Sequence, residues 1–248
     1  MDEIIVAKNL TKKFGDVMQV EVLHGIGISF SRQVFTAVIG PSGSGKTTLL
    51  NMLSLLEPLS SGQLFIDGID FSKGDINSYS QYRNQNFGFI FQFHYLLPEF
   101  TASENILLPS WIGEGKPSPE LKEKALGLME KLKIHHIRNK YPYEISGGEQ
   151  QRVAIARALF KNPKIVFADE PTGNLDRENG FLVLEMMTEM IKEMGVTLIM
   201  VTHDREIALQ ADKIVELVDG RICKAFRVKE TGKEKALELI GDRSCRIE

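Results

Sequence analysis

Cysteine is scarce in this sequence, and neither of its two cysteines, Cys223 and Cys245, lies in a CxxC pair. The sequence therefore suggests neither a zinc site nor a disulfide scaffold, and we expect no role for either residue. Long apolar runs are missing too, because none approaches the roughly 20 residues that a membrane-spanning helix needs. The first residues carry acids where a secretory signal carries bases. We expect a soluble, intracellular protein.

An excess of either charge is also absent. The 248 residues include 30 Lys and Arg against 33 Asp and Glu, for a formal net charge of -3. This balance gives no general attraction to nucleic acid or anionic lipid, so we expect no nucleic-acid partner. The length suits one principal domain with a large core.

Strand-like and helix-like patterns alternate along the chain. Short β-rich runs fill the first third, and a helical pattern opens at Lys46 and continues until Pro58. The middle, about 103–143, reads as a helical insertion with one helix near 119–132. From Gly147 onward, helices and strands alternate, which predicts a parallel sheet covered by helices. The predicted strands are 4–6, 20–30, 35–39, 63–66, 165–168, 196–201 and 213–218, and the later helices are 147–160, 180–194 and 205–210.

A glycine-rich loop lies between the predicted strand 35–39 and the helix that opens at Lys46. It fits the pattern G-x-x-x-x-G-K-[ST] in the required context. Glycines let backbone N–H groups approach phosphate oxygens, the helix N-terminus adds partial positive charge, and Lys46 can neutralise the β and γ phosphates. Thr47 can coordinate Mg²⁺. The residues expected to bind a nucleoside triphosphate here are Gly40, Pro41, Ser42, Gly43, Ser44, Gly45, Lys46, Thr47 and Thr48.

Two acids, Asp169 and Glu170, follow the apolar run 165–168 and precede Pro171. Ligands bind at the carboxyl ends of strands in sheets of this kind. We expect Asp169 to hold Mg²⁺ through a water and Glu170 to polarise the water that attacks the γ phosphate. Taken alone, the three residues would equally fit the start of a loop.

The stretch 145–159, ISGGEQQRVAIARAL, places Ser146, Gly147 and Gly148 before a helix. By itself this is a serine-capped helix. A capped helix N-terminus is also an anion site. Two phosphate-directed sites in one chain suggest two copies arranged head to tail, each completing the site of the other.

In these motifs and their order, the chain to about Ile222 resembles the nucleotide-binding subunits of ABC transporters, whose Leu-Ser-Gly-Gly-Gln signature is here Ile145 to Glu149. The resemblance implies an α/β fold of the P-loop NTPase, ABC-ATPase type, with a mixed or parallel core sheet and an N-terminal antiparallel β subdomain. It implies an ATPase domain at 1–222 with an inserted α-helical subdomain at about 93–160, and a C-terminal extension at 223–248. It also implies an ATPase that uses ATP and Mg²⁺, closes as a homodimer on ATP and passes the motion to membrane subunits.

The resemblance gives single residues their roles. Gln92 would contact Mg²⁺ and the γ phosphate, Asp176 would lie at the dimer seam, and His203 would contact the γ phosphate. Phe14 would stack on adenine where the family usually has tyrosine, although a role as core filler stays open. The implied catalytic residues are Glu170, His203 and Lys46, the metal contacts are Thr47, Gln92 and Asp169, and Ser146, Gly147, Gly148 and Glu149 would face the partner's ATP. His24, His94, His135 and His136 are interpreted as structural.

Glu149 departs from the family's glutamine. It puts a carboxylate near the helix N-terminus that is meant to receive a phosphate. We expect Ser146, Gly147 and Gly148 still to make the contacts, with affinity or turnover tuned.

Within the family, the stretches 87–109 and 169–176 are most similar to ATPases of lipoprotein-releasing systems, with macrolide-export and cell-division ATPases as near relatives. This similarity implies integral membrane permease subunits as partners and a peripheral location on the cytoplasmic face of the bacterial inner membrane. An aromatic and leucine cluster after Gln92 could be subdomain core or could line a groove for a partner's helix. Its members are Phe93, Tyr95, Leu96, Leu97 and Phe100.

Other functions remain possible at this point. A regulatory ATPase of cell division would signal through a membrane partner without moving a substrate. A soluble ABC ATPase of DNA repair or translation usually carries a long coiled coil or two cassettes, and a small-molecule kinase would leave Ser146 and His203 without a role. We expect lipoprotein release.

Overall fold

The computed structural model describes residues 2–15, 18–74, 76–115 and 117–241. The chain divides into two compact units, residues 1–79 with 197–248 and residues 80–196. Among the described residues, no helix combines the length and apolar character needed to span a membrane.

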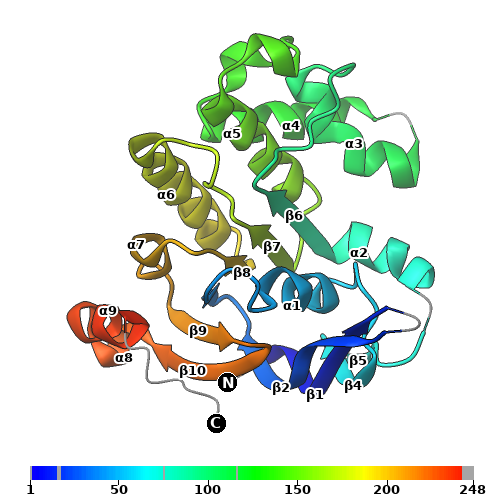
Figure 1. Cartoon of the computed structure of the whole chain (residues 1–248). Coiled ribbons are helices and arrows are strands. Elements are labelled where there is room, and N and C mark those ends of the chain that lie inside the picture. The colour runs from blue at the N-terminus through cyan, green and yellow to red at the C-terminus, as the bar shows by residue number, and fades with distance from the viewer. Residues whose placement is uncertain (1, 16–17, 75, 116, 242–248) are drawn as a thin grey trace. The chain divides into compact units, whose positions relative to one another are not determined.

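The first unit contains an antiparallel sheet with the strand order β2-β1-β4-β5 (Figure 1). Its central strand β1 (Glu3–Phe14) pairs with β2 (Val20–Ser31) and with β4 (Ser61–Ile66), which pairs in turn with β5 (Ile69–Asp70). The strands are longer than the sequence predicted, because register shifts let β1 continue past its polar residues.

The same unit carries parallel strands. β3 (Phe35–Ile39) pairs in parallel with β8 (Thr197–Val201) and with β9 (Lys213–Val218). Every residue of β3 and β8 is buried, as expected for strands covered on both faces. β10 (Arg221–Arg227), a strand that was not predicted from the sequence, pairs antiparallel with β9.

Short helices complete this unit. They are α1 (Lys46–Leu53), α7 (Arg205–Ala208), α8 (Val228–Thr231) and α9 (Lys233–Gly241), with a 3-10 turn, η1, at Ile76–Tyr79. The predicted helix from Lys46 to Pro58 is too long, because Leu55 adopts a φ of 59° and ends it. Cys223 on β10 is disulfide-bonded, although we expected no role for it, and Cys245 lies outside the described residues.

The second unit combines a parallel strand pair with most of the helices (Figure 1). β6 (Phe87–Phe91) pairs with β7 (Ile165–Asp169). Gly88 lets β6 lie against α5, since a Cβ there would come 2.4 Å from the carbonyl oxygen of Ala158. The helices are α2 (Ser80–Asn86), α3 (Ala102–Glu114), α4 (Pro119–Lys131), α5 (Gly147–Leu159) and α6 (Arg177–Glu193), with 3-10 turns η2 (His135–Ile137) and η3 (Pro142–Glu144).

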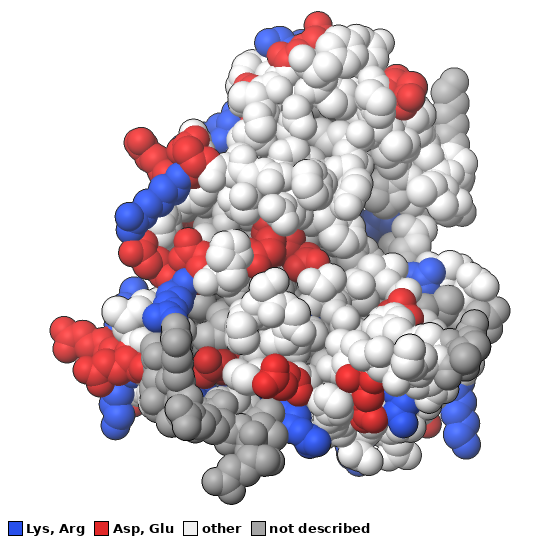
Figure 2. Space-filling model, in the orientation of Figure 1, with Lys and Arg blue, Asp and Glu red and all other residues white. Residues whose placement is uncertain are grey.

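Helix α3 was not predicted, because Pro109 lies inside it. The helix forms because Thr101 and Glu104 make a reciprocal capping box at its first turn. α6 begins earlier than predicted, at Arg177, because Asp176 caps it. Its exposed face carries charges of both signs, visible where α6 lies in Figure 2.

Asn105 on α3 holds the loop that precedes the helix. Its side chain is fully buried, and its Nδ2 donates to the carbonyl oxygens of Leu97, Phe100 and Thr101 at 3.1, 2.9 and 3.0 Å. Its Oδ1 accepts a hydrogen bond from the Leu97 N–H at 2.8 Å. One buried amide therefore bonds four backbone groups of segment 97–101.

We predict that Asn105→Ala lowers the free energy of unfolding by about 2–4 kcal/mol, because it leaves several buried backbone groups unpaired. Urea unfolding followed by fluorescence of Trp111, the only tryptophan and a residue of α3, measures this. Asn105→Asp keeps the acceptor and loses the donor, so its free energy of unfolding should lie between those of the wild type and Asn105→Ala. A change below about 0.5 kcal/mol for Asn105→Ala would contradict the role.

Candidate functional site

The glycine-rich loop lies in the first unit, between β3 and α1. Gly40 has a φ of 152°, and a Cβ there would lie 2.0 Å from the Leu217 carbonyl oxygen, so only glycine fits. The Gly220 N–H donates to the Ser44 carbonyl oxygen at 3.1 Å, which ties the loop to the turn after β9. The loop is thus shaped by the sheet beneath it.

Lys46 turns inward over this loop. Its Nζ donates to the Pro41 carbonyl oxygen at 2.8 Å, and the residue is only 9% exposed. The Ser44 hydroxyl is buried and has no hydrogen-bond partner among the described residues. A buried cation beside an unsatisfied hydroxyl, at the N-terminus of α1, is an arrangement that fits an anionic oxygen ligand.

His203 follows β8, and β8 is the parallel neighbour of β3. Because parallel strands end at the same edge, His203 and the glycine-rich loop share one edge of the sheet. Thr202 is buried and its N–H donates to the Val38 carbonyl oxygen, while Asp204 caps α7, so the exposed His203 is fixed on both sides.

Phe14 ends β1 with 41% of its surface exposed, so it is not buried in the core. The Lys12 ammonium lies 4.7 Å from the ring centroid. The ring is partly exposed, and an aromatic face of this kind can stack on a flat ligand.

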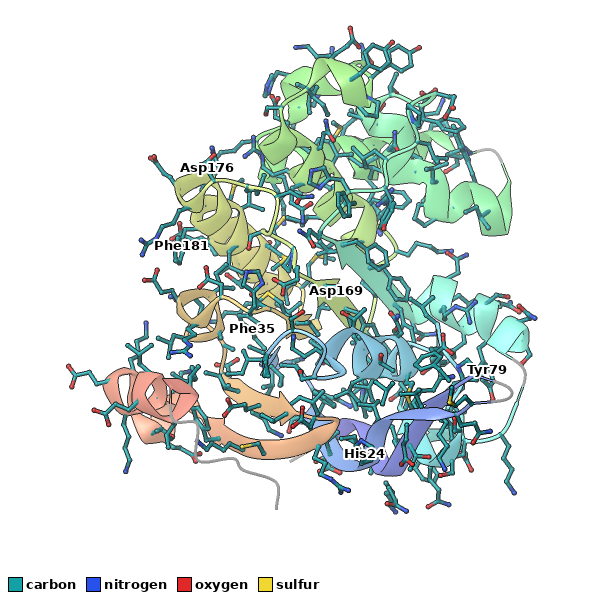
Figure 3. All side chains as sticks on the ribbon, viewed as in Figure 1. His24, Phe35, Tyr79, Asp169, Asp176 and Phe181 are labelled. Carbon is teal, nitrogen blue, oxygen red and sulfur yellow. The ribbon has the colours of Figure 1, made fainter. Side chains whose placement is uncertain are left out.

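The carboxylates lie in the second unit. Asp169 is the last residue of β7, as labelled in Figure 3, and follows four buried residues. Glu170 has a φ of 48°, and its carbonyl oxygen accepts a hydrogen bond from the Gly173 N–H at 3.0 Å. Both side chains are partly exposed.

Gln92 follows β6, whose last residue, Phe91, is opposite Asp169 in the parallel pair. The Gln92 Nε2 donates to Asn174 Oδ1 at 3.1 Å, and Asn174 Nδ2 donates to the Gln92 carbonyl oxygen at 2.8 Å. The contact of Asn174 with Gln92 was not predicted. The only indication of a role for Asn174 in the sequence is its position between Gly173 and Asp176, because Gln92 lies 82 positions away in the chain.

Ser146 caps α5, and Glu149 completes the cap. The Ser146 N–H and hydroxyl both donate to Glu149 Oε2, at 2.9 and 2.8 Å, and His136 Nε2 lies 3.0 Å from Glu149 Oε1. Both oxygens of the Glu149 carboxylate are therefore hydrogen-bonded, one to Ser146 and the other to His136. Burial raises the pKa of Glu149, but the hydrogen bonds from Ser146 and His136 outweigh it, and the net shift is downward.

This shift predicts how stability depends on pH. A folded-state pKa below the unfolded value stabilises the protein above about pH 4.3, and the stabilisation is lost as the pH falls through the folded-state pKa. Glu149→Gln lacks this dependence. The difference in urea midpoint between wild type and Glu149→Gln should therefore shrink between pH 7 and pH 3. A constant difference would show that the carboxylate charge has no part in the cap.

Asp176 caps α6 (Figure 3). Its Oδ1 accepts a hydrogen bond from the Asn179 N–H at 3.0 Å, and Asn179 Nδ2 donates to its Oδ2 at 2.6 Å. These hydrogen bonds lower the pKa of Asp176. Asp176 thus has a local structural task.

The cluster after Gln92 divides between partly buried residues, Leu96 and Phe100, and exposed residues. Phe100 packs against Trp111 with ring centroids 5.3 Å apart, whereas Phe93, Tyr95 and Leu97 are exposed. Tyr95 and Leu97 line a groove of about 480 Å³ within the second unit. The groove is also lined by Phe91, Leu108, Ile112 and Arg157.

The predicted site residues thus fall into two sets, one in each unit. The first unit gathers the glycine-rich loop, His203 and Phe14, and the second gathers Gln92, Asp169, Glu170 and the Ser146 helix tip. Residues 23–173 match the family model of ABC transporters. The chain belongs to the ABC transporter family.

Similar proteins agree with this family. The chain is 40% identical to the lipoprotein-releasing system ATP-binding protein LolD 1 of Rhodopseudomonas palustris, over 90% of this chain and 100% of that protein. It is 44% identical to the lipoprotein-releasing system ATP-binding protein LolD of Aquifex aeolicus, over 90% of this chain and 97% of that protein. A dimeric structure of the ATP-binding cassette MJ0796 bound to ADP and Pi superposes with a TM-score of 0.82 at 34% identity, covering 90% of this chain and 98% of that one.

The prediction of an ABC-ATPase fold is confirmed. So is the prediction that the chain is an ATP-binding, ATP-hydrolysing subunit of a transporter.

Proposed function

We propose that this protein is the ATPase subunit of a bacterial complex that releases lipoproteins from the inner membrane. The observation that carries the proposal is the 40–44% identity, over nine-tenths of the chain, to relatives named for that system. Macrolide export and cell division, the alternatives left by the sequence, are not favoured by these relatives. ATP hydrolysis would supply the work, and the membrane subunits would contact the lipoprotein.

The first unit would hold the nucleotide. Phe14 would stack on the adenine, and the N–H groups of the loop Gly40 to Thr48 would surround the phosphates. Lys46 would exchange the Pro41 carbonyl oxygen for phosphate oxygens, and the Ser44 hydroxyl would gain a partner. His203 would contact the γ phosphate from the neighbouring strand end.

Mg²⁺ fits the residues present. Thr47, Asp169 and Gln92 offer oxygen donors, and Mg²⁺ bound to phosphates needs only one or two protein ligands and keeps several waters. When bound, it would neutralise charge on the phosphates. Glu170 would accept the proton of the attacking water, a task that its partial exposure permits.

The helix tip of α5 would act on the ATP of a second copy. Ser146, Gly147 and Gly148 carry the first N–H groups of the helix, and Asp176 would lie at the seam between copies. The dimeric state of the MJ0796 cassette, found with ADP and Pi, supports a homodimer. In this contact the Ser146 hydroxyl would have to release Glu149 Oε2, to which it donates here, in order to donate to a phosphate oxygen.

The partner would be an integral membrane permease of the lipoprotein-releasing type, which would place the protein at the cytoplasmic face of the inner membrane. The groove beside Tyr95 and Leu97 would receive a helix of that partner, because its exposed lining is largely apolar. We also propose that the ATPase domain spans 1–222 with a helical insertion at about 93–160, followed by an extension at 223–248.

Depletion of the protein in its host tests the proposal. We expect lipoproteins to accumulate in the inner membrane, and membrane subunits with large extracytoplasmic domains to be recovered with the protein from detergent extracts. Normal lipoprotein transfer together with failed septation would instead support a role in cell division.

We predict that Glu170→Gln still binds ATP but loses hydrolysis by about 100-fold or more, because the attacking water loses its base. The variant should accumulate as a dimer, which gel filtration with ATP and Mg²⁺ measures. The wild type with and without ATP is the control. A monomeric or fully active variant would disprove the role of Glu170.

We predict that Ile112→Glu sharply reduces recovery of the membrane subunits. Ile112 is 82% exposed and lines the groove, and a buried unpaired carboxylate there would be costly. Leu237→Glu is the matched control, since Leu237 is 46% exposed on α9 and lies outside the groove. Equal recovery with both variants would exclude the groove as the docking site.

A further inference from the structure

Gln151 on α5 is a fully buried amide with both ends hydrogen-bonded. Its Nε2 donates to the Pro171 carbonyl oxygen at 2.5 Å, and its Oε1 lies 2.5 Å from Nδ1 of His94. All three residues belong to the second unit. From the sequence alone, His94 is expected to be structural and Gln151 has no expected role.

The chemistry of the groups fixes the direction of these two hydrogen bonds. A carbonyl oxygen can only accept, so the amide nitrogen of Gln151 must face Pro171. The amide oxygen then faces His94 and can only accept as well. His94 must therefore carry its proton on Nδ1, and the chain His94 to Gln151 to Pro171 has one donor and one acceptor at each step.

At one end of this hydrogen-bonded series, Gln151 contacts the turn that carries Glu170. Glu170 has a φ of 48°, a left-handed conformation that is unfavourable for a residue other than glycine. Pro171 further restricts the backbone of the residue before it. The hydrogen bonds that hold the turn include the internal bond from Gly173 to Glu170 and the bond from the Gln151 amide to Pro171. Loss of the amide removes the restraint at Pro171, the residue directly after Glu170.

The other end of the hydrogen-bonded series is His94, which adjoins the groove through Tyr95; we call segment 94–95 the groove wall. His94 lies two residues after Gln92 and directly before Tyr95, which lines the groove. Arg157, six residues after Gln151 on α5, donates to the carbonyl oxygens of His94 and Tyr95 at 2.6 and 2.7 Å. Burial lowers the pKa of Arg157 to about 10, so its guanidinium stays charged at neutral pH. The segment 94–95 is therefore attached to α5 at two points.

We propose that His94 and Gln151 are positioning residues that link the groove wall to the turn of Glu170, so that turnover depends on this hydrogen-bonded chain. The inference rests on the proposed ATPase mechanism with Glu170 as the base. A displacement of segment 94–95 would be transmitted through Gln151 to Pro171. A partner in the groove could thus alter hydrolysis without touching the nucleotide.

Steady-state ATP hydrolysis by the full chain with Mg²⁺ tests the proposal. Gln151→Met keeps the length of the side chain and removes both polar ends, and we expect kcat to fall about 10- to 100-fold because the base is displaced. The KM for ATP should change by less than about twofold, since the interaction lost acts in the transition state. Gln150→Met is the matched control, because Gln150 bonds the carbonyl oxygens of Pro142 and Ile145 instead.

His94 provides a second, independent pair of variants. Asn can place an amide N–H near the position of Nδ1, so His94→Asn should restore kcat to within about threefold of wild type, whereas His94→Leu should lower it about tenfold. Hydrogen exchange of a peptide spanning 169–176 reports the turn directly. We expect faster exchange in Gln151→Met and His94→Leu than in His94→Asn.

Several outcomes would overturn the proposal. These are a wild-type kcat in Gln151→Met, an equal loss in Gln150→Met, and equal kcat values for His94→Asn and His94→Leu. If Gln151→Met fails to fold, as judged by Trp111 fluorescence, the His94 pair decides alone. Failure of the proposed function is distinguishable, because it requires that the wild type not hydrolyse ATP or that Glu170→Gln remain active.

Discussion

Parallel pairing of short, fully buried strands is the constraint on which the candidate site depends. Because such strands end at the same edge, the pairing of β3 with β8 puts the glycine-rich loop and His203 side by side, and the pairing of β6 with β7 does the same for Gln92 and Asp169. The buried residues that supply the pairing have no chemistry of their own. They fix where the reactive residues leave the sheet.

Helix α5 carries the polar attachments of the second unit. Its tip bears the cap made by Ser146 and Glu149, its buried side bears Gln151, and a later turn bears Arg157. A rigid helix with attachments along its length moves them together. Motion of the segment after β6, of the Glu170 turn and of the helix tip is therefore expected to be correlated.

Much of the fold and of the site could be predicted from the sequence. The glycine-rich loop, the acids after the buried run 165–168 and the Ser146 helix tip combine a local pattern with a local context, and both are visible in one chain. The features that were not predicted depend on partners far away in the sequence, or on hydrogen bonds that offset an unfavourable residue. Pro109 argued against α3, but Asn105 and the cap at Thr101 outweigh its missing N–H. His94 and Asn174 gain their tasks from Gln151 and Gln92, 57 and 82 positions away.

The hydrogen bond of Lys46 within its own loop has a consequence for ligand entry. Together with the link from Gly220 to Ser44, it gives the loop its shape from contacts within the chain. Binding then costs little ordering of the backbone, because the dihedral angles are already set. A preorganised loop of this kind favours rapid capture of its ligand, so slow steps of the cycle would be sought in larger movements of the protein.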